Sequence, residues 1–275
     1  MSQQTPSSPA PRDWLLLIGG STYKFTLTGF YLVALVAILK NHGYSLNQLS
    51  WIHLIGGIEA AKVLFAALME RRPAGRFGRF RGWLLAATLG LSAVFGLIAC
   101  TDITQNFPLL LACCVLLSAM SAVYGCAMLG LSCIVLPHRE RGFGGVIQTM
   151  AARGGKMIGG ALVLWLYQEY GQTAAAGFML AFTLLMLLQL LCYREPESPT
   201  AQGGLTALAA RLVSFWQQPE TGCRWLVLLF AVAAPYAFAA ATFVPKLADL
   251  GFNPKQTGGI LAVGIPVACL IVTPL

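Results

Sequence analysis

The sequence is poor in charged residues, and in acidic residues above all. Only 10% of its residues are charged and 57% are hydrophobic, whereas about a quarter of a typical soluble domain is charged. Its 10 Asp and Glu residues are outnumbered by 18 Lys and Arg residues, which gives a net charge of +8. Apolar runs near the roughly 20 residues that cross a bilayer recur along the chain. This composition excludes a soluble globular domain and predicts an all-α polytopic membrane protein in contact with the lipid bilayer.

The motifs of enzymes and metal sites are also missing from the sequence. It has no Ser-His-Asp set, no metal-ligand spacing and no phosphate-binding Gly-rich loop. Its eight cysteines are scattered and form no C-x-x-C pair. The first 11 residues lack the basic start and small-residue cleavage site of a signal peptide. We therefore expect no catalytic activity, no cofactor, no bound metal and no nucleic-acid partner.

The apolar windows predict about eight membrane-spanning helices. We expect them at residues 14–39, 49–69, 83–99, 109–136, 144–166, 174–192, 225–247 and 256–275. The second connection between them is strongly basic, with Arg71, Arg72, Arg76, Arg79 and Arg81. Because basic residues gather on the cytoplasmic side, we expect a multi-pass protein with a cytoplasmic N-terminus.

The order of the spans predicts a protein built from two halves. We expect a cytoplasmic tail at 1–13, a six-helix half at 14–192, a linker with an amphipathic helix at 193–224, and the start of a second half at 225–275. A weak repeat relates residues 43–49 to residues 251–257, since both are Gly-aromatic-polar turns before a span. Parallel six-span halves are a recognised transporter design. Twelve spans are therefore expected, and the sequence reads as C-terminally truncated.

Four cationic residues and one acid lie within the predicted spans: Lys24, Lys62, Arg153, Lys156 and Glu59. A charge at mid-membrane depth costs about 2.5–3.5 kcal/mol even on lenient scales, so such residues usually face a bundle interior or a watery cavity. An excess of buried positive charge favours the binding of an anion. We therefore predict that the four cations line a cavity for a small anionic solute.

Four of these residues, Glu59, Lys62, Arg153 and Lys156, also have a simpler interpretation. Glu59 and Lys62 are three residues apart on one helix, so they either neutralise each other as an ion pair or form a proton-coupling site with its charge partner. Lys24 lies in a polar patch of Ser, Thr and Tyr at residues 21–28, which favours solute contact. Arg153 and Lys156 share a helix face among glycines, where they either bind solute or bond to carbonyls of a neighbouring helix.

The basic connection at residues 70–81 resembles the signature loop of the major facilitator superfamily. In that family the loop packs the two halves together on the cytoplasmic side and helps to gate alternating access. The resemblance implies a gating role for the acid, glycine and arginines of this loop, namely Glu70, Arg71, Gly75, Arg76 and Arg79. The alternative is a basic anchor that only sets the orientation of the chain.

Further motifs resemble one branch of that superfamily. They are G-Y-S-L-N-Q at 43–48, L-P-H-R-E-R-G-F-G at 136–144 and R-G-G-K-M-I-G-G at 153–160. The branch comprises the AmpG-type muropeptide permeases and the related RhtX/FptX-type siderophore importers of bacterial inner membranes. This chain departs from it in span four, where the usual acidic pair is missing, and in span seven, which lacks the usual Lys and Asp. Glu59 is then the one candidate left within a span for proton coupling.

The resemblance and the basic cavity together predict a bacterial inner-membrane permease. We expect it to import an anionic small molecule by alternating access, with Glu59 as the proton-coupling residue. An iron–siderophore complex is the favoured substrate, and an anhydromuropeptide is the alternative. A truncated membrane protein that transports nothing is the third possibility.

Overall fold

The computed structural model describes residues 9–45, 51–52, 54–55, 57–71, 78–101, 106–137 and 139–196, with isolated residues between 210 and 235. The regular elements of this part are helices. They are α1 (Pro11–Gly29), η1 (Phe30–Ala34), α2 (Leu35–Asn41), η2 (Gly57–Ala61), α4 (Lys62–Arg71), α5 (Phe80–Cys100), α6 (Phe107–Val135), α7 (Arg141–Lys156), η3 (Met157–Leu162) and α8 (Val163–Cys192). The all-α prediction is confirmed for these residues.

Four helical stretches in the described part are long and apolar enough to cross a membrane. They are Pro11–Lys40, Phe80–Cys100, Phe107–Val135 and Arg141–Cys192, which is 52 residues long. The first three contain the predicted spans 14–39, 83–99 and most of 109–136. The fourth contains both 144–166 and 174–192. The predicted span 49–69 overlaps η2 and α4, which are not among the helices long enough to cross a membrane. The predicted spans 225–247 and 256–275 lie largely or wholly outside the described residues, so eight spans are not confirmed.

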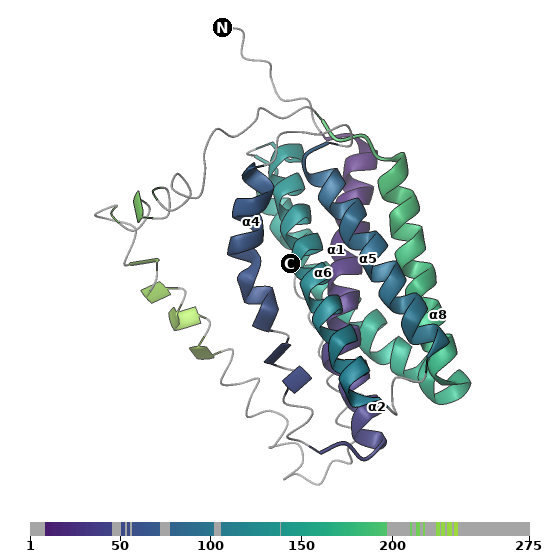
Figure 1. Cartoon of the computed structure of the whole chain (residues 1–275). Helices are drawn as coiled ribbons and strands as arrows, with labels where there is room; N and C mark the ends of the chain where they lie inside the picture. Colours follow the sequence, from purple (N-terminus) through teal and green to yellow (C-terminus); the bar gives the residue numbers. More distant parts are fainter. Residues whose placement is uncertain are drawn as a thin grey trace, which may run out of the picture.

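Gly171 divides the 52-residue stretch into two antiparallel arms. Its φ of 83° and ψ of −176° are not helical, and a positive φ of this kind favours glycine. Directly after it, the Gln172 side-chain amide donates to the carbonyls of Ile98 and Thr101 at 2.9 and 2.7 Å. At the other end of this arm, Arg81 donates to the carbonyl of Leu190. The arm after Gly171 therefore runs antiparallel to α5, beside which it lies in Figure 1.

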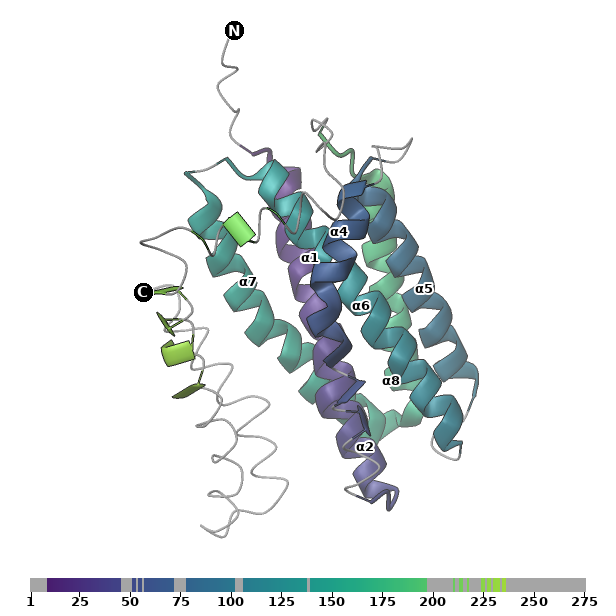
Figure 2. The ribbon, with the colours of Figure 1, turned by 60° about the vertical axis from the view of Figure 1, so that its left-hand side comes forward.

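Helix α1 packs closely against α7 and η3, and Figure 2 shows α7 running alongside it. Gly155 and Gly159 form a G-x-x-x-G pair on this contact. A Cβ at Gly155 would lie 2.6 Å from the Thr22 carbonyl oxygen and 2.8 Å from the Phe25 Cβ. Small residues let membrane helices approach in this way, because van der Waals contact between backbones replaces the hydrophobic effect within lipid. This contact fixes the side of α1 that carries Phe25.

In the interior of the bundle, the buried rings of Tyr23 and Tyr124 and the partly buried ring of Phe182 join α1, α6 and α8. The Tyr23 ring meets Tyr124 and Phe182 edge-on at centroid distances of 5.2 and 5.6 Å. The Tyr23 hydroxyl donates to Thr183 at 2.9 Å. Because an unpaired hydroxyl is costly in an apolar interior, this bond fixes the rotation of α1 toward α8.

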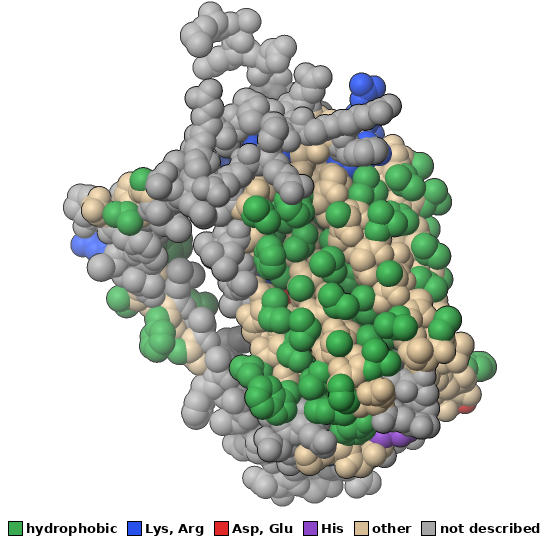
Figure 3. All heavy atoms as spheres, in the orientation of Figure 1, with side chains coloured by type: hydrophobic (Ala, Val, Ile, Leu, Met, Phe, Trp, Pro, Cys, Tyr) green, Lys and Arg blue, Asp and Glu red, His purple; other side chains and the backbone are tan. Residues whose placement is uncertain are grey.

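The outside of the helices is apolar over most of their length. Leu89, Leu185 and Leu188 are more than half exposed. Figure 3 shows hydrophobic side chains spread over one face of the helices, with several Lys and Arg side chains near one end. Such a surface suits contact with lipid tails rather than water. The bundle therefore has the surface of a multi-pass membrane protein. The cytoplasmic location of the N-terminus stays a prediction.

Candidate functional site

The Glu59 carboxylate is the centre of a polar cluster inside the bundle. Its Oε2 atom accepts from the Lys62 ammonium at 2.8 Å and from the Lys24 ammonium at 3.3 Å. Its Oε1 atom accepts from the Tyr31 hydroxyl at 3.1 Å and from the Ser121 hydroxyl at 3.2 Å. The side chains of Lys24, Glu59 and Lys62 are 12%, 18% and 28% exposed. One carboxylate thus binds two cations and two neutral donors.

Five helical elements supply this cluster. Lys24 comes from α1, Tyr31 from η1, Glu59 from η2, Lys62 from α4 and Ser121 from α6. The Glu59–Lys62 contact follows from their spacing of three residues, whereas the contact with Lys24 joins residues 35 apart in the sequence. One turn before Ser121, the Ser118 hydroxyl donates to the Ile55 carbonyl at 3.0 Å and ties α6 to the segment that precedes η2. The cluster therefore forms only when α1, α4 and α6 pack together.

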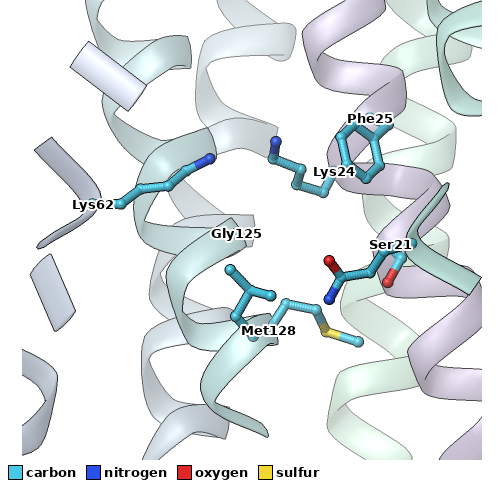
Figure 4. Close-up of a pocket in the computed structure, with 8 residues that line it drawn as sticks. Ser21, Lys24, Phe25, Lys62, Gly125 and Met128 are labelled. Carbon is cyan, nitrogen blue, oxygen red and sulfur yellow. The ribbon is translucent and has the colours of Figure 1, made fainter. Parts of the chain in front are cut away.

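A cavity of about 200 Å³ lies beside the two lysines. Figure 4 shows the side chains of Lys24 and Lys62 extending toward each other from opposite sides of it. The cavity is lined by Ser21, Lys24, Phe25, Lys62, Gly125, Met128, Leu129 and Gln148. Its wall thus combines ammonium groups, a hydroxyl and an amide with an aromatic ring and apolar side chains. Ligand sites are commonly built in this way, with few polar groups that fix orientation in a largely apolar pocket.

Gly125 of α6 keeps the space between the lysines open. A Cβ at this position would lie 3.1 Å from Lys24 Cε and 3.7 Å from Lys62 Cε. A larger side chain would therefore compete with the two ammonium arms. The sequence analysis missed Gly125, Tyr31, Ser121 and Gln148 as site residues. The spacing of Ser118, Ser121 and Gly125 on one helix face was the signal that could have indicated the α6 contribution.

Arg153 and Lys156 do not line this cavity. They lie in the last turn of α7, where Arg153 is half-buried and Lys156 is exposed. Gly155 between them packs against α1. The structure therefore brings together Lys24, Lys62 and Glu59 of the predicted set, and it places the two α7 cations elsewhere. A role for Arg153 and Lys156 in solute binding stays a prediction.

The predicted gating loop is described only in part. Gly75 and Arg76 lie outside the described residues, as do the side chains of Glu70 and Arg71, although their backbone ends α4. Arg79 is buried, and its guanidinium carbon lies 5.4 Å from the Phe80 ring centroid. The gating role of the five residues stays a prediction.

The end of this loop is tied to the end of α8 through Glu195. The Glu195 carboxylate accepts from the backbone N–H of Phe80 at 3.1 Å and from that of Arg81 at 2.8 Å. These are unpaired donors of the first turn of α5, where a negative charge also complements the helix dipole. Gly78, with a φ of 88°, lies against the same carboxylate. The sequence analysis took Glu195 as part of a linker and did not expect this contact.

No group of three or more His, Cys, Asp or Glu in the described part of the chain could hold a metal ion. The polar cluster is instead a carboxylate between two lysines.

Comparison with known proteins places this bundle in a family. The model of the Major Facilitator Superfamily matches residues 16–275. Two curated relatives are the proteins named anhydromuropeptide permease of Escherichia coli strain K12 and of Escherichia coli O157:H7. Each is 28% identical over 256 residues, which cover 90% of this chain and 51% of the relative.

The chain thus spans about half the length of these relatives. Neither is named as a siderophore importer, so the predicted siderophore branch has no support from them. The predicted superfamily is confirmed, because the family model covers most of the chain: this protein belongs to the Major Facilitator Superfamily.

Proposed function

We propose that this chain acts in a secondary transporter that imports a small anionic solute across the bacterial inner membrane. The observation that carries the proposal is the cavity beside Lys24 and Lys62, two ammonium groups that share the single carboxylate of Glu59. An anionic group of the solute would bind to the ammonium groups from the cavity side. Membership of the family supports alternating access, in which two halves of the transporter rock about such a site.

An anhydromuropeptide is the substrate that we propose. Two curated relatives carry the name anhydromuropeptide permease, and the carboxylates of a muropeptide suit a basic cavity. The lining also offers the Ser21 hydroxyl and the Gln148 amide for the neutral polar groups of such a molecule.

Proton coupling at Glu59 remains part of the proposal. The carboxylate accepts four hydrogen bonds, two of them from ammonium groups, so it must lose partners before it can take up a proton. Binding of a solute anion to the lysines would weaken those contacts. Uptake that depends on a proton gradient in the wild-type chain, and not in Glu59→Gln, is the expected result.

The test is uptake of radiolabelled anhydromuropeptide by bacteria that lack their own muropeptide permease and express this chain. Unlabelled competitors would be a neutral disaccharide and a ferric siderophore. We expect uptake above the empty-vector level that the neutral sugar does not reduce. Competition by the siderophore would favour that substrate, and uptake at the empty-vector level would contradict the proposal.

A further inference from the structure

We infer that the cavity carries one uncompensated positive charge and is selective for solutes that present a single negative charge to it. Glu59 sets this selectivity because its carboxylate neutralises one of the two positive charges of Lys24 and Lys62. The inference deepens the proposed function and rests on it, because it assigns the class of anionic group that the same site takes: one carboxylate, in preference to a dianion or a neutral group.

The charge count comes from the contacts of Glu59. Two ammonium groups, Lys24 and Lys62, bond to one oxygen of one carboxylate, which leaves a net charge of +1. The hydroxyls of Tyr31 and Ser121, which bond to the other oxygen, are neutral. No further Asp, Glu, Lys, Arg or His is among the described residues that line the cavity. The excess charge therefore has no counter-ion in the described part of the site.

Glu59 has no acceptor position left for the other N–H groups of the two ammonium groups. A carboxylate offers about four lone-pair positions, and four donors already approach the two oxygens of Glu59. An ammonium, by contrast, has three donors. Each lysine gives one of them to Glu59, and both lysines line the cavity. The remaining donors are thus available to a ligand that brings its own acceptors.

The surroundings of the lysines favour one compact anion. Lys24 Nζ lies 4.3 Å from the centroid of the Phe25 ring, whose face partly compensates a cation without removing its charge. The cavity of about 200 Å³ is below the roughly 300–1,000 Å³ of sites that enclose a drug-sized ligand. It therefore suits the anionic end of a solute, with the rest of the molecule outside it.

The net charge of this partly buried site then determines which ligand binds most tightly: a neutral group, a monoanion or a dianion. A single carboxylate brings the cluster to neutrality, whereas a dianion reverses its charge and a neutral group leaves the excess uncompensated. Charges in low-dielectric surroundings are costly unless they are paired. We therefore expect the monoanion to bind at least about tenfold more tightly than either alternative, which corresponds to about 1.4 kcal/mol.

The test uses three probes of nearly the same shape and the full chain in lipid nanodiscs. N-acetylasparagine amide is neutral, N-acetylasparagine is a monoanion and N-acetylaspartate is a dianion. Their dissociation constants would be measured by titration calorimetry. The wild-type chain should prefer N-acetylasparagine. Preference for the dianion, equal binding of all three, or binding of none would overturn the inference.

Variants of the cluster provide a charge-rescue test. Glu59→Gln raises the net charge to +2 and should shift the preference to N-acetylaspartate. Adding Lys62→Met to Glu59→Gln returns the charge to +1 and should restore the preference for N-acetylasparagine. Lys40→Met, at the exposed end of α2, is the matched control and should leave the ratio unchanged. An unchanged ratio in folded Glu59→Gln contradicts the inference. If that variant does not fold, Lys62→Met alone makes the cluster neutral and should abolish the preference for N-acetylasparagine, and an unchanged preference there would contradict the inference equally.

This test separates the inference from the proposed function. Muropeptide uptake by a chain whose probe binding ignores charge would refute the inference alone. Charge-selective binding of the probes by a chain that imports no muropeptide would refute the proposed substrate alone.

Discussion

Glu195 accepts a hydrogen bond from the backbone N–H of Arg81 at 2.8 Å, although the two residues are 114 positions apart in the sequence. Arg81 returns the connection through its side chain, whose guanidinium donates to the carbonyls of Leu190 and Leu191, both at 2.9 Å. The Glu195 side chain thus satisfies unpaired N–H groups at the start of α5, and the Arg81 side chain satisfies unpaired carbonyls at the end of α8. This reciprocal capping fixes one end of the bundle next to the loop with the predicted gating role.

Replacing Glu195 should therefore loosen that end of the bundle. Loss of a side chain that caps a helix costs about 0.5–2 kcal/mol, and Glu195→Ala should lower the unfolding midpoint of the detergent-solubilised chain accordingly. Glu169→Ala, at an exposed position on α8, is the control and should have little effect. Equal midpoints for the two variants would show that the capping contact contributes nothing to stability.

The contact between α1 and α7 should depend on Gly155 and not on its neighbour. A side chain at Gly155 would meet the backbone of α1, whereas nothing lies within 4 Å of a Cβ at Gly154. Overpacking of a close contact typically costs about 1–3 kcal/mol, so Gly155→Val should lower the unfolding midpoint and Gly154→Val should not. Similar midpoints for both variants would contradict the packing described here.

Gly125 provides a way to close the cavity without touching a charge. Gly125→Val should fill the space between Lys24 and Lys62, because a Cβ there already lies 3.1 Å from Lys24 Cε. We expect probe binding to weaken at least about tenfold, the equivalent of about 1.4 kcal/mol. Gly96→Val, where nothing lies within 4 Å, should bind the probe like the wild-type chain. Full binding by folded Gly125→Val would show that the ligand uses another place.

The Tyr31 and Ser121 hydroxyls that donate to Glu59 should hold its carboxylate in place. Tyr31→Phe removes the donor 3.1 Å from Oε1 while keeping the ring. A lost hydrogen bond to a charged group costs about 1.5–3 kcal/mol, so the unfolding midpoint should fall, while the net charge of the cluster and the preference for the monoanion remain. Tyr170→Phe, at an exposed position, is the matched control. A changed ligand preference in Tyr31→Phe would show that the hydroxyl does more than hold Glu59.

The sequence predicted those parts of the fold and site that depend on local pattern. The apolar runs indicated α5 and α6 to within a few residues, and the spacing of Glu59 and Lys62 indicated their contact. The bond between Lys24 and Glu59 was not predictable in this way. It depends on the rotation of α1, which Tyr23 and the glycines of α7 and η3 fix through contacts remote in sequence.

The same limit applies to the two cations of α7 and to Glu195. Arg153 and Lys156 are cations within a predicted span, as expected of cavity residues. The direction in which they face, however, follows from where Gly155 meets α1. Glu195 follows the last span in a Pro-containing stretch that is typical of a linker, and its partner is the start of α5. Charge at membrane depth thus indicated candidate site residues, and packing determines which of them lie together beside the cavity.

The measurement that tests the central claim most directly is uptake of labelled anhydromuropeptide by four lysine variants with equal membrane abundance. If the solute binds beside Glu59, Lys24→Met and Lys62→Met should each reduce uptake at least about tenfold, which corresponds to about 1.4 kcal/mol of lost binding. Lys40→Met and Lys156→Met, outside the cavity, should retain it. Undiminished uptake in both cavity variants would contradict the claim, as would loss confined to Lys156→Met.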